Sequence, residues 1–176
     1  MTSSEELWDL AIQPEKKIDE LARYGDKHRF KMPIALRNRS GYDFSFSGLK
    51  TAAFKVIQEK DFLKDNQNIY DLCSSLQYAI VSALLEKTFK AARELNISHI
   101  VIGGGVAANS YLRSSLSDRS VEEKIKLFLP GSRHCTDNAV MIARAALIKI
   151  NNDQKSSLTL DVSASMPIEL KDDLYR

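Results

Sequence analysis

The sequence lacks the features that mark a secreted or membrane protein. No apolar run approaches the ~20 residues that a transmembrane helix needs. The N-terminal segment MTSSEELWDL is acidic and has no apolar centre, so it is not typical of a secretory signal. Two cysteines, Cys73 and Cys135, make neither a disulfide framework nor a paired metal motif. We therefore expect a cytoplasmic, reducing compartment, with a mitochondrial location as the alternative and no membrane partner.

Histidine is also scarce, which excludes one class of enzyme. The three histidines are His28, His99 and His134, and no two lie four residues apart. An HExxH arrangement for zinc-protease chemistry is therefore absent. His99 precedes an apolar segment and is expected to be structural. His134 and Asp137 could reach one cation, but two ligands do not make a stable metal site.

The composition is typical of a soluble globular domain. The chain has 176 residues, of which 44% are apolar and 27% charged, so it can form one domain with a sizeable core. A net charge of +2 decides nothing about nucleic-acid binding. There is no internal repeat and no linker long enough to divide the chain in two.

The most informative segment is residues 100–112, IVIGGGVAANSYL. His99–Ile102 has the apolar, β-branched character of a buried parallel strand. Three glycines follow this strand: Gly103, Gly104 and Gly105. Without Cβ atoms they can adopt positive φ and let a flat or charged ligand approach the main chain. A helix starting near Ala108 or Asn109 would direct free N–H groups at that ligand. A tight turn without a ligand is the alternative.

Asn109 has two candidate roles. Its amide can donate and accept hydrogen bonds, which suits ribose hydroxyls or an adenine edge. Asparagine is also among the best helix N-caps. The residues alone leave both roles open.

Periodicity predicts a chain of helices with a few short strands. Helices are predicted over residues 4–10, 14–25, 47–58, 66–95 and about 137–150, and strands over residues 43–46, 99–102 and 126–129. The apolar stripe of helix 66–95 is expected to pack in the core. Beyond residue 150 the chain is polar, with a candidate edge strand over 158–162 and a poorly ordered end.

Several side chains at element ends have predicted structural roles. Ser47 is expected to cap helix 47–58, and Thr136 or Asp137 to cap the last helix. The buried face of the last helix is predicted to consist of Met141, Ile142, Ala145 and Ile148.

The segment around residues 43–51 adds two aromatic rings and a lysine. Phe44 and Phe46 are expected to anchor the strand in the core. Lys50, near a helix start, is expected to face water, with a phosphate contact as the alternative.

Residues 27–39 are the one basic stretch. Its cations are Lys27, Arg29, Lys31, Arg37 and Arg39. They surround Phe30, and Pro33 prevents a regular helix. A solvated loop is the simpler interpretation, and a phosphate-contacting edge for RNA is the alternative.

Three segments together carry a resemblance to a known family. They are DFSFSGLKT at 43–51, IGGGVAANSYLR at 102–113 and HCTDNAVMIA at 134–143. In the same order, they resemble signatures of the TsaD/Gcp/Qri-type family, formerly called O-sialoglycoprotein endopeptidase, which makes N6-threonylcarbamoyladenosine in tRNA. The resemblance covers residues 14–150, which match only the C-terminal part of such a protein.

The resemblance implies an α/β fold, namely one lobe of an actin-like (ASKHA) ATPase with a mixed sheet flanked by helices. Residues 1–150 would form this lobe and 151–176 a tail. The implied reaction is acyl transfer: N6 of the adenosine 3′ of the anticodon attacks the carbamoyl carbon of threonylcarbamoyl-AMP, and AMP leaves. The nucleotide would contact the glycine run and Asn109.

The resemblance also implies a divalent metal, iron or zinc. Asp137 matches the family's aspartate ligand, whose partners are two histidines of an HxxxH helix. The same carboxylate has an ordinary explanation as a helix cap. HxxxH is absent here, as is the family's SGGHT-like phosphate loop.

We therefore expect this chain alone to be an incomplete, inactive enzyme. An incomplete gene prediction or truncated sequence, a proteolytic fragment and a genuine short paralogue all fit, and the intact motifs favour the first. The implied partners are tRNA and accessory subunits of the threonylcarbamoylation complex, in a homodimer or heterodimer. The rival hypothesis is a non-catalytic nucleotide-binding or scaffold module of a tRNA-modifying complex.

Overall fold

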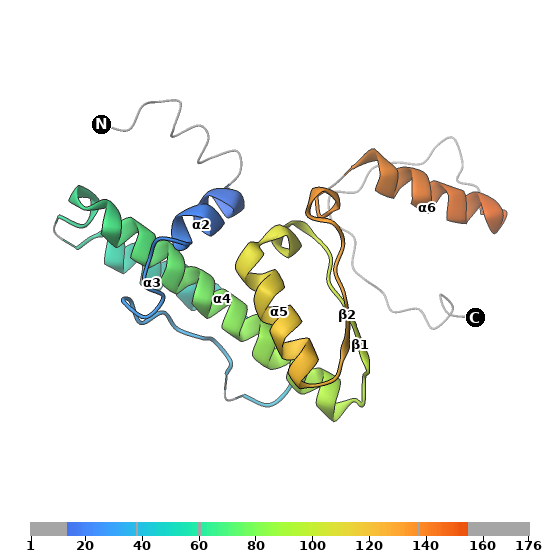
Figure 1. Cartoon of the computed structure of the whole chain (residues 1–176), viewed down its shortest axis with the longest axis horizontal. Helices are drawn as coiled ribbons and strands as arrows, with labels where there is room; N and C mark the ends of the chain where they lie inside the picture. Colours follow the sequence, from blue (N-terminus) through green and yellow to red (C-terminus); the bar gives the residue numbers. More distant parts are fainter. Residues whose placement is uncertain (1–13, 38, 60, 137, 155–176) are drawn as a thin grey trace. The chain divides into compact units, whose positions relative to one another are not determined.

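The computed structural model describes residues 14–37, 39–59, 61–136 and 138–154 (Figure 1). The chain divides into two compact units, residues 1–137 and 138–176, although the sequence shows no linker between them. The predicted helix 4–10 and strand 158–162 lie outside the described residues. In the described ranges, no helix is both long and apolar enough to cross a membrane.

The first unit is organised around the long helix α4, Asn66–Glu94, of 29 residues. Asp65 caps this helix, because its carboxylate accepts the Gln67 N–H at 2.9 Å. At ~1.5 Å per residue α4 is about 43 Å long, so other elements can pack along it (Figure 1). The predicted apolar stripe is confirmed as core, with Leu72 and Ala83 both buried.

Helix α2, Pro14–Ala22, packs against α4. Gly25 follows it at a point where the two backbones almost touch. A Cβ atom on Gly25 would lie 2.0 Å from the Tyr70 carbonyl oxygen. The next residue, Asp26, donates its N–H to Asp71 Oδ1 at 2.8 Å. Only glycine fits this crossing.

Gly25→Ala is expected to lower the free energy of unfolding by about 2 kcal/mol, because the added methyl overlaps backbone atoms that cannot move aside as a side chain can. Urea unfolding of the 176-residue chain measures the change. Gly48→Ala on helix α3, Ser47–Ile57, is the matched control, since a Cβ there meets nothing within 4 Å. Equal stability of the two variants would show that α2 and α4 do not cross this closely.

A two-stranded parallel sheet completes the first unit. It consists of β1, His99–Val101, and β2, Lys126–Phe128. The connection is a short 3₁₀ turn, η2 (Gly105–Ala108), followed by α5 (Ser110–Glu122). The core cluster between the sheet and the helices consists of Val81, Phe89, Ala92, Ile100, Leu112 and Leu116. The α/β class is confirmed, while the mixed sheet of an actin-like lobe stays a prediction.

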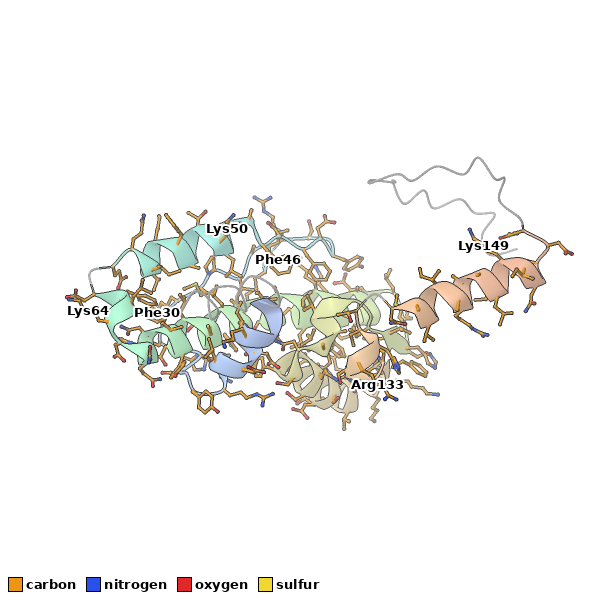
Figure 2. All side chains as sticks on the ribbon, turned by 90° about the horizontal axis from the view of Figure 1, so that it is seen from above. Phe30, Phe46, Lys50, Lys64, Arg133 and Lys149 are labelled. Carbon is orange, nitrogen blue, oxygen red and sulfur yellow. The ribbon has the colours of Figure 1, made fainter. Side chains whose placement is uncertain are left out.

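Residues 43–46 form no strand, so that prediction is wrong. The described sheet contains only β1 and β2, and no neighbouring strand accepts hydrogen bonds from this segment. Phe44 and Phe46 are 47% and 40% exposed, not in the core, and stack on each other with ring centroids 6.5 Å apart. Figure 2 shows Phe46 and Lys50 at the start of α3, Ser47–Ile57. Phe46, not Ser47, occupies the N-cap position, without a side-chain hydrogen bond.

The second unit contains helix α6, Ala139–Asn151. Asn138 caps it, because its side-chain oxygen accepts the Met141 N–H at 3.1 Å. The prediction that Thr136 or Asp137 is the cap is therefore wrong. The predicted buried face is also wrong. All four of its residues are exposed: Met141, Ile142, Ala145 and Ile148. A single described helix has nothing within its own unit to bury this face against.

Candidate functional site

The glycine run forms an open loop at the end of β1. The chain leaves the sheet at Ile102, whose N–H donates to the Phe128 carbonyl at 3.1 Å. Gly104 has a φ of +89°, which strains any residue with a Cβ. All three glycines are exposed, and added Cβ atoms would meet nothing within 4 Å. Ala107, 1% exposed, anchors the far end of the loop. The loop therefore presents bare main chain to solvent.

Asn109 is the N-cap of α5. Its Oδ1 accepts the Leu112 N–H at 2.8 Å, which confirms the capping role that the residue type allows. No hydrogen bond from its Nδ2 is found among the described residues. The cap therefore uses one end of the amide and leaves the donor end available. The two roles considered from the sequence are compatible.

Asp19 is a site residue that the sequence did not reveal. It lies on α2, is 9% exposed, and its Oδ2 accepts the Ser110 N–H at 3.0 Å. Its Oδ1 accepts hydrogen bonds from Ser110 Oγ at 2.8 Å and Gln77 Nε2 at 2.7 Å. A buried carboxylate thus complements the positive end of the α5 dipole. The expectation of free N–H groups in the first turn of α5 is wrong for Ser110 and Leu112, which are both bonded.

A cavity of about 250 Å³ opens beside this carboxylate, which we call the Asp19 cavity. Its lining combines one acid, two cations and several hydroxyls. The polar members are Asp19, Arg23, Lys27, Ser74, Gln77, Ser110, Tyr111 and Ser114. A carboxylate offers about four lone-pair sites, and Asp19 uses three of them for Ser110 and Gln77. Arg23 Nη2 also lies 3.8 Å from Asp19 Oδ2, an ion pair beyond hydrogen-bond distance, so one acceptor position of the carboxylate makes no hydrogen bond.

Arg113 joins the glycine loop to the loop that leads to Asp137. Its guanidinium donates to the Ala107 carbonyl at 2.9 Å and to the Pro130 carbonyl at 2.8 Å. The short turn η3, Ser132–His134, lies against η2. The middle of the motif at 102–113 therefore lies beside the start of the motif at 134–143, although the two are separate in the sequence. Arg113 is the last residue of the motif at 102–113, but only its contacts in the fold reveal its role.

The described residues do not by themselves fit a metal ion. Within those ranges, no three His, Cys, Asp or Glu side chains gather closely enough to hold one. His134 is exposed on η3, and His99 is exposed on β1. Asp137 lies outside the described residues, so its predicted roles as ligand and as the neighbour of Gly103–Asn109 remain predictions.

The strand, open glycine loop and capped helix leave main chain accessible to close approach from solvent. Residues 1–144 match the TsaD family model, described as tRNA N6-adenosine threonylcarbamoyltransferase. The chain therefore belongs to this family, as the resemblance indicated.

Three curated relatives with the name tRNA N6-adenosine threonylcarbamoyltransferase support this family membership. The protein from Thermosipho africanus is 43% identical over 152 residues, which cover 86% of this chain and 46% of the relative. That from Caldicellulosiruptor saccharolyticus is 44% identical over 140 residues, covering 80% and 41%. That from an Anaeromyxobacter species is 49% identical over 129 residues, covering 73% and 38%. The chain thus spans less than half the length of these relatives.

Proposed function

We propose that this chain supplies the nucleotide-binding half of a tRNA N6-adenosine threonylcarbamoyltransferase. The donor is threonylcarbamoyl-AMP, and the acceptor is the adenosine 3′ of the anticodon. The observation that carries the proposal is the convergence of Asp19, Asn109 and the glycine loop on the start of α5, from segments about 90 residues apart in sequence.

Each group has a role that its chemistry supports. The bare main chain at Gly103–Gly105 allows the flat adenine or the phosphate to lie against it. The spare acceptor of Asp19 suits a ribose hydroxyl, and Asn109 Nδ2 is a donor for the base or sugar. Arg23 and Lys27 line the Asp19 cavity, whose lining does not include the glycine run or Asn109, and they complement a phosphate. Such fixed contacts would hold the carbamoyl carbon in place for attack by the amine.

The chain is not proposed to complete the reaction alone. Asp137 is the one residue for which the family signature supports a metal-binding role, and we propose that the two histidine ligands implied by the family are supplied by the other half of the enzyme. We expect no transfer by the purified 176 residues. The same 176 residues should support threonylcarbamoyl transfer when they are joined to the other half of a family member.

The test is a pair of Asn109 variants titrated with AMP. Asn109→Ser keeps a good capping oxygen but removes the amide donor, whereas Asn109→Ala removes both. AMP affinity should fall about tenfold in each, the scale of one lost hydrogen bond. Only the alanine variant should lose stability, by about 1 kcal/mol. Calorimetric titration and thermal unfolding of the chain give the two readouts.

Unchanged AMP affinity in the serine variant would show that Asn109 is a cap and no more. AMP binding as proposed, together with no transfer after joining to a family member's other half, would instead favour the non-catalytic nucleotide-binding or scaffold module.

A further inference from the structure

Residues 27–31, here called the basic loop, present three cations on a fixed backbone. Lys27, Arg29 and Lys31 are all exposed. The Phe30 N–H donates to the Oγ of buried Ser75 on α4 at 3.2 Å, and that hydroxyl donates to the Asp26 carbonyl at 3.3 Å. The segment is not a helix, as Pro33 predicts for residues 27–39, and its cations are exposed as in a solvated loop, but its backbone is anchored to α4.

The nearby carboxylates do not neutralise these cations. Asp26 Oδ1 accepts the His28 N–H at 2.8 Å, and Asp71 Oδ1 accepts the Asp26 N–H at 2.8 Å. Among the described residues, no ion pair involves Lys27, Arg29 or Lys31. Arg37, later in the same basic stretch, is different because it pairs with Glu86 at 2.7 Å. Within the basic stretch 27–39, the cations without an ion pair among the described residues are therefore Lys27, Arg29, Lys31 and Arg39, and the first three lie in the basic loop.

Aromatic rings from other elements lie beside the cations of the basic loop. Lys27 Nζ lies 5.3 Å from the Tyr78 ring centroid and 5.8 Å from that of Tyr111. The His28 ring meets Tyr78 edge-on, with centroids 5.1 Å apart. A second cavity, of about 180 Å³, is lined by Lys27, His28, Phe30, Lys31, Met32, Ser75, Tyr78 and Ala79. Rings beside cations are the arrangement that holds unpaired nucleotides, with bases against rings and phosphates against ammonium groups.

Lys27 connects this second cavity to the Asp19 cavity, because it lines both. We propose that the basic loop and the second cavity bind the backbone and one unpaired nucleotide of an RNA. This inference rests on the proposed function: an RNA held here lies directly beside a nucleotide donor in the Asp19 cavity. An acidic peptide would also meet the cations, but it would make no use of Phe30 and Tyr78 as stacking surfaces.

The experiment measures binding of the 176-residue chain to a tRNA anticodon stem-loop by fluorescence anisotropy at several salt concentrations. The double variant Arg29→Gln, Lys31→Gln removes two exposed charges that form no ion pair among the described residues, although the Arg29 guanidinium lies 5.7 Å from the Phe30 ring centroid. Its affinity should fall about tenfold at ~0.1 M salt, and the slope of log K against log salt should drop by roughly 1.4. The matched control is Lys55→Gln, Lys124→Gln, on α3 and just after α5, which changes net charge equally at two other exposed sites. The control should bind like the unchanged chain.

Equal losses in the two double variants would overturn the proposal, since they would show only a general effect of charge. The proposal would also be overturned if the unchanged chain did not bind RNA. A poly-glutamate peptide provides a further test. If the Arg29, Lys31 variant loses affinity for this peptide but not for RNA, the surface binds an acidic protein segment, and the RNA proposal is overturned. AMP titrations of the same variants distinguish a failure of the RNA-binding proposal from a failure of the proposed function. If the Arg29, Lys31 variant binds both AMP and RNA like the unchanged chain, only the RNA-binding role of the basic loop is refuted.

Discussion

Replacing Asp19 by alanine should weaken AMP binding roughly 50-fold and lower the free energy of unfolding by about 3 kcal/mol. The stability loss follows because Gln77 Nε2 and the Ser110 N–H lose a buried acceptor. The binding loss follows because a charged acceptor beside the cavity disappears. Calorimetric titration of the chain with AMP, below the unfolding range of the variant, measures the first quantity, and urea unfolding the second.

Asp118→Ala is the matched control for Asp19. Asp118 is an exposed carboxylate on α5 that lines a different and larger cavity between α4 and α5. This variant should bind AMP and unfold like the unchanged chain. If Asp19→Ala loses stability but keeps full AMP affinity, the carboxylate is a structural clamp on α5 and the nucleotide lies elsewhere.

Arg113→Ala should destabilise the chain by about 4 kcal/mol, because two half-buried carbonyls lose a charged donor at once. The effect should be local as well as global. Hydrogen exchange should accelerate at Ala107 and Asn109 in one loop and at His134 and Cys135 in the other, because the guanidinium ties both together.

Arg133→Ala provides the comparison for Arg113. Arg133 lies exposed on η3, in one of the same loops, as Figure 2 shows. Its removal should leave both exchange rates and stability unchanged. Faster exchange confined to the Pro130 side in Arg113→Ala would contradict the claim that this side chain couples the two motifs.

The regular parts of the fold were predictable because their signals are local. The stripe of α4 repeats over eight turns, and β1 and β2 are apolar runs that end at glycine or proline, so their bounds were predicted to within about two residues. The segment 43–46 has the same alternation as a strand, but alternation does not reveal whether a neighbouring strand exists. The apolar residues of α6 repeat with helical periodicity, but this periodicity does not show whether another element buries them.

The candidate site was predictable only in part, for a related reason. Gly103–Gly105 and Asn109 stand out because glycine and asparagine have special backbone and capping properties. Asp19 looks like any acidic residue of a short helix until the fold brings it to α5. The same holds for Lys27, whose two tyrosines lie on α4 and α5.

The central claim is that these residues form the working nucleotide site of a tRNA threonylcarbamoyltransferase. Its most direct test is a chimera in which residues 1–144 replace the matched segment of the Thermosipho africanus relative. The measurement is N6-threonylcarbamoyladenosine in tRNA from a strain that lacks its own enzyme and carries the chimera. We predict that the chimera restores the modified nucleoside and that its Asp19→Ala form does not. A chimera that folds and binds AMP but leaves the tRNA unmodified would contradict the account.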